Sequence, residues 1–140
     1  AAGLMQLMPD TAAILGGRHQ RALYDPTINL TLGQDYAARL LGNPAVRGNL
    51  FLAVAAYNAG PGNLAQWRDL DRTPDSLLFI ENMPARETRQ FVQRVMASFW
   101  IYQQRLGEAT SSLDAVASGR WPTYAKLDGS TAKIAANGAN

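Results

Sequence analysis

Cysteine is absent from the 140 residues, histidine occurs once, and only 17% of the residues are charged. Without cysteine the chain can form no disulfide and offers no thiolate as a nucleophile or metal ligand. The single histidine, His19, lies in a Gly-Arg-His-Gln-Arg stretch with no second histidine and no acidic cluster beside it. The sequence therefore supports neither a metal site nor a catalytic triad.

Long apolar runs and blocks of like charge are also absent. No segment approaches the roughly 18 apolar residues of a membrane span, and the chain does not open on the basic and apolar stretches of a signal peptide. The 13 Lys and Arg residues are interspersed with 11 Asp and Glu residues, which gives a net charge of +2. This pattern argues against a nucleic-acid binder, although a mildly basic surface suits an anionic polymer.

What the sequence does contain is 47% hydrophobic residues and recurrent helix signals. Proline, aspartate and asparagine mark helix starts, glycine marks helix ends, and no alternating strand pattern of useful length is present. We therefore predict a mainly α fold in one domain over residues 1–124, with a loop over 18–24 and a small, polar, flexible tail over 125–140. The predicted helices cover residues 9–15, 26–41, 50–57, 63–70, 75–82, 85–106 and 112–117.

Three of these helices carry predictions about the core. The helix over 50–57 is apolar on every side, so it should be buried all round. The helix over 26–41 and the helix over 85–106 are each expected to bury one apolar face. In the former the face comprises Ile28, Leu32, Tyr36 and Leu40; in the latter it comprises Phe91, Val95, Met96, Phe99, Tyr102 and Leu106.

An amide stands in the apolar opening segment Gly3-Leu4-Met5-Gln6-Leu7-Met8-Pro9. One interpretation is that Gln6 faces water at the edge of an element. The other is that Gln6 is a buried amide, whose two donors and one acceptor are satisfied by a ligand rich in polar groups. In that case the neighbouring methionines would form an adaptable wall beside the ligand.

Polar side chains also interrupt two later apolar segments. Tyr57 and Asn58 end the apolar helix just before the turn Gly60-Pro61-Gly62. Tyr57 could be a core residue whose hydroxyl donates to a backbone carbonyl, but the turn opens space beside that hydroxyl and favours a functional role. Asn58 is expected to hold the turn. Glu81 stands at the edge of an apolar patch, where an ordinary exposed glutamate is the default.

Three segments resemble, in order, the motifs of the lytic transglycosylase family, in its soluble, superhelical-ring branch. They are the opening segment Gly3–Pro9, the segment from Tyr57 to Gly62 with Trp67 after it, and the segment around Glu81 with Glu87-Thr88-Arg89 after it. The resemblance implies a lysozyme-like, mainly α fold of the goose-type lysozyme and lytic transglycosylase kind. It implies a peptidoglycan lytic transglycosylase that requires no metal or cofactor. Such an enzyme cleaves the β-1,4 bond between N-acetylmuramic acid (MurNAc) and N-acetylglucosamine (GlcNAc) and leaves 1,6-anhydro-MurNAc ends.

The resemblance also has consequences for the site. The residues that it implies as substrate-binding are Gln6, Met8, Tyr57, Asn58 and Glu81. In the family a single glutamate acts first as acid and then as base, and it precedes the Gly-Leu-Met-Gln motif. We therefore expect this glutamate upstream of Ala1, on a first helix that the chain lacks. The 140 residues alone are then expected to fold poorly and to show little or no catalysis.

The expected partners are peptidoglycan glycan strands in a bacterial cell envelope, in the periplasm; neither a nucleic acid nor a particular protein partner is indicated. Two alternatives remain. One is a goose-type-like muramidase that hydrolyses the same bond with water, and the other is a non-catalytic peptidoglycan-binding module. Trp67 and Trp121 could stack on sugar rings, whereas Trp100, within a long helix, is expected to pack in the core.

Overall fold

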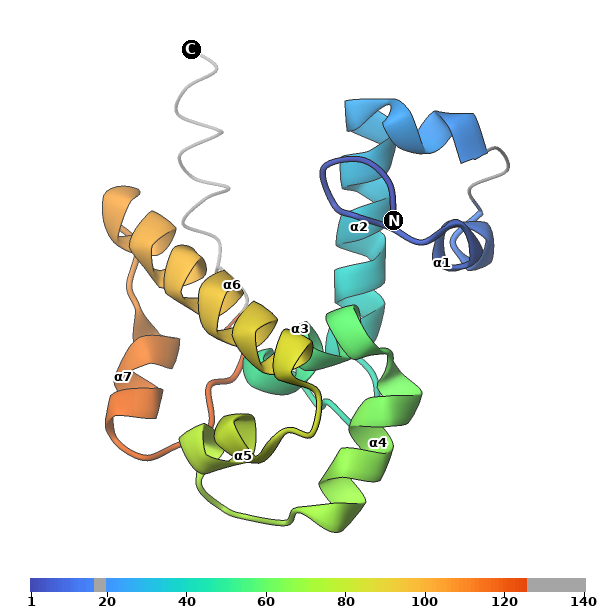
Figure 1. Ribbon diagram of the computed structural model, residues 1–140. Helices are drawn as coiled ribbons and strands as arrows, with labels where there is room; N and C mark the ends of the chain where they lie inside the picture. The colour runs from blue at the N-terminus through green and yellow to red at the C-terminus, as the bar shows by residue number, and fades with distance from the viewer. Residues whose placement is uncertain (17–19, 126–140) are drawn as a thin grey trace.

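The computed structural model describes residues 1–16 and 20–125, and this part of the chain is mainly helical (Figure 1). The helices are α1 (Pro9–Ile14), η1 (Gln20–Tyr24), α2 (Pro26–Leu41), α3 (Leu50–Ala59), α4 (Pro61–Leu70), α5 (Ser76–Asn82), α6 (Arg86–Arg105) and α7 (Ser111–Ala117). His19 and nearly all of the predicted tail lie outside the described residues.

Side-chain caps explain why the predicted starts of α2 and α3 are accurate, whereas α4, which has no side-chain cap, begins at Pro61 and not at residue 63. Asp25 precedes Pro26 and accepts a hydrogen bond from the backbone N–H of Ile28 at 3.0 Å. Asn49 caps α3 in the same way through the N–H of Leu52, at 3.2 Å. These caps satisfy backbone donors that have no partner within the helix. The predicted loop over 18–24 is wrong from residue 20 onward, because η1 is a short 3₁₀ helix, a tight turn for which the sequence carries no comparable cap signal; residues 18 and 19 lie outside the described residues.

The core is built around α3, as its apolar sequence predicts. Six of the ten residues of this helix are buried and the other four are partly buried, and the helix contacts α2, α4 and α6. Figure 1 shows α6 lying across α3, with α4 and α5 below, while α2 rises away from this body. A second, smaller cluster of buried apolar residues surrounds the upper part of α2, where the N-terminal segment and α1 pack. Two clusters therefore make up the core, and Tyr36 and Tyr57 pack against both.

The predicted apolar face of α6 is only partly correct. The buried residues of this helix are Thr88, Val92 and Met96, whereas Tyr102 is 61% exposed and Leu106 is 72% exposed. The reason is that α6 covers α3 as far as Trp100, whereas the last residues of α6 continue past it (Figure 1). The prediction that Trp100 packs in the core is confirmed: its ring meets Phe51 edge-on, and its Nε1 donates to Ser112 at 2.9 Å.

The segment that follows α7 packs against the α3 core. The carbonyl of Pro122 accepts from the N–H of Leu50 at 2.8 Å, and the N–H of Tyr124 donates to Gly48 at 2.7 Å. Trp121 donates from Nε1 to the carbonyl of Pro74 at 2.8 Å, and its ring packs against the α3 core. The indole of Trp121 is therefore occupied by contacts within the domain.

Candidate functional site

A tight turn near the N-terminus is the first part of the candidate site. Ala2 and Leu7 face each other in a short antiparallel bridge, with N–H to carbonyl distances of 2.9 and 3.1 Å. Between them the N–H of Gln6 donates to the carbonyl of Gly3 at 3.2 Å. We call residues 3–8 the Gly3–Met8 loop. Its sharp course requires positive φ angles at Gly3 (70°) and Gln6 (49°).

The loop presents its polar and thioether groups to the outside. Met8 is 54% exposed, and Gln6 is exposed as well. The interpretation of Gln6 as a buried amide is therefore wrong. A residue at the tip of a tight turn projects from the surface, and the Gln6 Nε2 donates to the Gly3 carbonyl at 2.8 Å instead of filling a cavity. The amide lies at an exposed edge, where it is accessible to a ligand.

A buried asparagine on α2 holds this loop from behind. Asn29 has none of its surface exposed. Its Nδ2 donates to the carbonyls of Ala2 and Leu23, each at 3.0 Å, and its Oδ1 accepts from the N–H of Met5 at 2.7 Å. A fully buried amide is stable only when its donors and acceptor are satisfied, and here backbone groups satisfy them.

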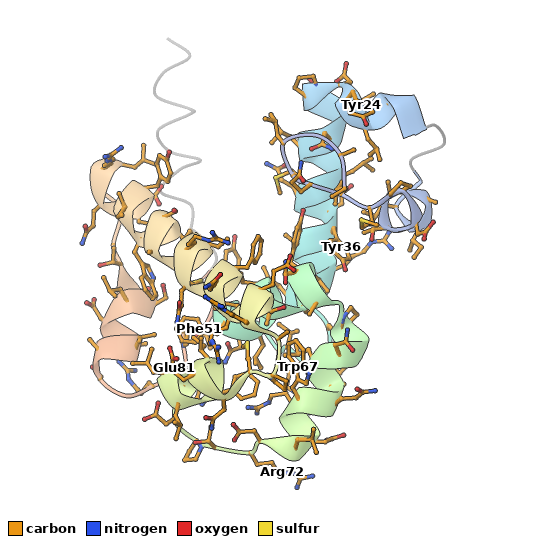
Figure 2. The ribbon with its side chains drawn as sticks, in the orientation of Figure 1. Tyr24, Tyr36, Phe51, Trp67, Arg72 and Glu81 are labelled. Carbon is orange, nitrogen blue, oxygen red and sulfur yellow. The ribbon has the colours of Figure 1, made fainter. Side chains whose placement is uncertain are left out.

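Tyr57 joins the loop to the end of α3. Its hydroxyl donates to the carbonyl of Met5 at 2.8 Å, and its ring lies 5.2 Å from that of Tyr36, centroid to centroid, at an interplanar angle of 53°. Figure 2 shows Tyr36 near the lower end of α2, where this helix meets the body built on α3. Burial, with a smaller contribution from Tyr36, raises the pKa of Tyr57 to about 12.

The chemistry open to Tyr57 follows from this geometry. The phenol stays protonated near neutral pH, so it cannot act as a base there. Its one proton is donated to Met5, which leaves the oxygen lone pairs free to accept a hydrogen bond from an acid or a sugar hydroxyl. The hydrogen bond from this hydroxyl to a backbone carbonyl agrees with the interpretation of Tyr57 as a core residue. The carbonyl belongs to the exposed Gly3–Met8 loop, however, and this agrees with a functional role of Tyr57 in the site.

Asn58, the next residue, faces another helix. Its Oδ1 accepts from the hydroxyl of Thr88, in the first turn of α6, at 2.6 Å. The turn after α3 is held differently: Gly60 adopts a φ of 87°, and Asn63 donates from Nδ2 to the carbonyl of Ala59 at 2.8 Å. The prediction that Asn58 holds the turn is therefore wrong, since its side chain ties α3 to α6 instead.

Glu81 lies on α5 and is exposed (Figure 2). Its Oε1 accepts from Gln93 Nε2 at 2.8 Å, and its backbone carbonyl accepts from Arg89 Nη1 at 2.7 Å. Both donors lie in the first half of α6. A carboxylate held in this way remains a strong hydrogen-bond acceptor for a ligand hydroxyl.

The predicted residues thus fall into two groups. Gln6, Met8 and Tyr57 are joined through the Gly3–Met8 loop, whereas Asn58 and Glu81 are both held by the first half of α6. Sequence reasoning placed Tyr36 on the apolar face of α2 and Thr88 in a family motif, without the contacts that they make, and it missed Asn29 and Gln93. Asn29 does leave a signal in the sequence, because it extends the buried face of α2 at helical spacing through Leu32, Gly33, Tyr36 and Leu40.

Two further observations concern residues 1–16 and 20–125. No helix in this part of the chain is both long enough and apolar enough to span a membrane. Within the same ranges, no three His, Cys, Asp or Glu side chains are grouped in a way that could hold a metal ion.

Comparison with known proteins identifies relatives of this chain. A soluble lytic murein transglycosylase of Escherichia coli is 34% identical in an alignment 132 residues long that covers 86% of this chain and 20% of that protein. A putative soluble lytic murein transglycosylase of Haemophilus influenzae is 36% identical in an alignment 112 residues long that covers 74% of this chain and 18% of that protein. The chain therefore spans about a fifth of the length of these relatives.

Among solved structures, the chain is similar to lytic transglycosylase Slt of Pseudomonas aeruginosa, determined as an inactive glutamate-to-glutamine mutant. The TM-score is 0.66 and the identity 40%, over 75% of this chain and 18% of that one. This match confirms the predicted mainly α, lysozyme-like fold. Residues 1–80 match the family model of the transglycosylase SLT domain. Because that match covers more than half of the 140 residues, the chain belongs to the transglycosylase SLT domain family, the lytic transglycosylases that its motifs predict.

Proposed function

We propose that this chain is part of a peptidoglycan lytic transglycosylase, which cleaves the MurNAc–GlcNAc β-1,4 bond and forms 1,6-anhydro-MurNAc ends. The observation that supports this most strongly is the 2.8 Å hydrogen bond from the Tyr57 hydroxyl to the Met5 carbonyl. It joins two motifs that lie 52 residues apart in the sequence. A phenol oxygen with free lone pairs therefore lies beside a loop whose amide and thioether groups are exposed.

The proposed reaction needs a proton on the leaving oxygen and stabilisation of a positively charged, oxocarbenium-like sugar. The MurNAc 6-hydroxyl then attacks the anomeric carbon, and its proton passes to the base that first acted as the acid. We assign both steps to a glutamate that precedes Ala1. Within the described chain, Asp25 and Asp75 cap helices, Asp71 accepts from Asn82, and Glu81 accepts from Gln93. These carboxylates have structural partners.

In this proposal the glycan is bound by side chains of the Gly3–Met8 loop and, separately, by Glu81 on α5. Gln6 offers an amide to hydroxyl and acetamido groups, and Met8 offers a polarizable thioether to the face of a sugar ring. Glu81 accepts hydrogen bonds from sugar hydroxyls. Asn58 supports Glu81 indirectly, because it fixes the first turn of α6, close to Arg89 and Gln93, the two residues that donate to Glu81. We propose that the protein acts in a bacterial envelope, in the periplasm; the proposed substrate and the similarity to soluble lytic murein transglycosylases support this location.

The test is the chemistry of the products. The gene product, read from its own start codon, is incubated with purified peptidoglycan, and the released muropeptides are analysed by mass spectrometry. We expect 1,6-anhydro-MurNAc ends, which weigh one water less than hydrolysed ends. Reducing MurNAc ends would instead show a muramidase. Binding to peptidoglycan without any released product would show a non-catalytic binding module, and either result would refute the proposal.

A further inference from the structure

We propose that Asn29 is a positioning residue for this reaction, because it fixes the Met5 peptide that orients the Tyr57 hydroxyl. The inference rests on the proposed function. Asn29 is fully buried beneath the loop, so its side chain does not contact the glycan. It would act through the backbone of Met5, whose N–H and carbonyl are both engaged in the structure.

The hydrogen bonds form a continuous path from α2 to α3. Asn29 Oδ1 accepts from the N–H of Met5 at 2.7 Å, and the Met5 carbonyl accepts from Tyr57 at 2.8 Å. Asn29 Nδ2 uses both of its protons, one on Ala2 at the base of the loop and one on Leu23 at the end of η1. A single side chain therefore fixes the loop at two points and the connection before α2 at a third.

Close packing removes the remaining freedom of the loop. A Cβ atom added to Gly3 would lie 2.3 Å from Asn29 Nδ2 and 2.5 Å from the Leu23 carbonyl oxygen. A Cβ atom added to Gly33, one turn along α2, would lie 2.4 Å from the Cγ of Met5. Contacts this short do not occur in folded proteins, so Gly3 rests directly on the Asn29 side chain and the Leu23 carbonyl, and Met5 rests on the α2 backbone at Gly33.

Removing the amide of Asn29 should therefore change the position of the Tyr57 hydroxyl. Without Nδ2, the Leu23 carbonyl loses its side-chain donor and the Ala2 carbonyl keeps only the N–H of Leu7, so the loop moves to regain solvent or other partners. The Met5 carbonyl moves with it, and the Tyr57 hydroxyl loses its acceptor or turns with the loop. A displacement of about 1 Å in a positioning group can cost about a hundredfold in rate.

The experiment is a double-mutant cycle on the gene product. Asn29→Asp keeps the side-chain volume and the acceptor for Met5 but removes both Nδ2 donors. We expect kcat for release of anhydro ends to fall by about 10- to 100-fold. In a Tyr57→Phe background, Asn29→Asp should change kcat less than about threefold, since the group it positions is already gone. Asn63→Asp, which alters an exposed amide in the turn after α3, is the matched control.

Two outcomes would overturn the inference. One is an unchanged kcat in folded Asn29→Asp protein; the other is equal losses with and without the Tyr57 hydroxyl, as a general loss of folded protein would give. If Asn29→Asp does not fold, Gly33→Ala provides the same cycle, because it displaces Met5 while leaving Asn29 in place. Failure of the proposed function is a separate result, since the wild-type protein would then release no anhydro ends.

Discussion

Replacing Tyr57 with phenylalanine is expected to lower the release of anhydro ends by about a hundredfold or more. A group that stabilises charge in a transition state contributes roughly this much. The ring keeps its volume and its packing against Tyr36, and only the hydrogen bond to Met5 is lost. The free energy of unfolding should therefore fall by only about 1 kcal/mol. Turnover is measured on purified peptidoglycan and stability by denaturant titration.

Tyr102→Phe is the matched control, because this tyrosine is 61% exposed on the second half of α6. It should change neither turnover nor stability measurably. If Tyr57→Phe keeps wild-type turnover while its melting temperature falls, Tyr57 is a core residue and has no part in the reaction.

Replacing Phe51 with alanine, at the other end of α3, is expected to lower the free energy of unfolding strongly and to change turnover little, the reverse of Tyr57→Phe. This side chain is 2% exposed and packs edge-on against Trp100. Its removal should cost about 3–5 kcal/mol, through lost burial and the cavity left behind. That is a large part of the roughly 5–15 kcal/mol that stabilises a typical domain. The measurement is the shift of the denaturation midpoint.

Where the Phe51→Ala protein remains folded, its turnover per folded molecule should stay close to that of the wild type, because Phe51 packs in the α3 cluster and not against the loop. Leu70→Ala, at an exposed position on α4, is the control and should cost little stability. A loss below about 1 kcal/mol in Phe51→Ala would show that α3 is not the centre of the core.

These paired predictions reflect how differently the fold and the site are encoded. The start of α2 could be predicted because Asp25 and Pro26 act locally, through one cap and one fixed φ angle. The exposed end of α6 could not be predicted, because the sequence of α6 is amphipathic throughout. The length of α3 beneath α6 determines which of its residues are buried. Tertiary contact thus decided which part of the α6 face is buried.

The site, too, could be predicted only in part. The motifs single out Gln6, Tyr57 and Glu81, but not the side chains to which each is bonded. Asn29 is the clearest omission. The four-residue spacing from Ile28 suggested an apolar stripe, yet Ile28 is 41% exposed and Asn29 is buried in its place. A polar residue on a buried helix face is unfavourable in isolation, and only the backbone of the distant loop accounts for it.

The most direct test of the proposed site is where a glycan binds, and the methionines of the chain provide the probes. Met5 and Met8 lie in the Gly3–Met8 loop, whereas Met83 and Met96 are each only 2% exposed, in the α3 core. The gene product is labelled with ¹³C at the methionine methyl groups, and each signal is assigned by a Met→Leu substitution. It is then titrated with the disaccharide GlcNAc–1,6-anhydro-MurNAc, which contains no MurNAc–GlcNAc bond to cleave.

The Met8 signal, and to a lesser extent that of Met5, should shift in a saturable manner, while those of Met83 and Met96 remain in place. Gln6→Ala should weaken this binding, by roughly the fivefold to tenfold expected for one lost hydrogen bond of about 1 kcal/mol. Saturable binding that leaves the Met5 and Met8 signals unchanged would place the glycan elsewhere and contradict a site built on this loop and Tyr57.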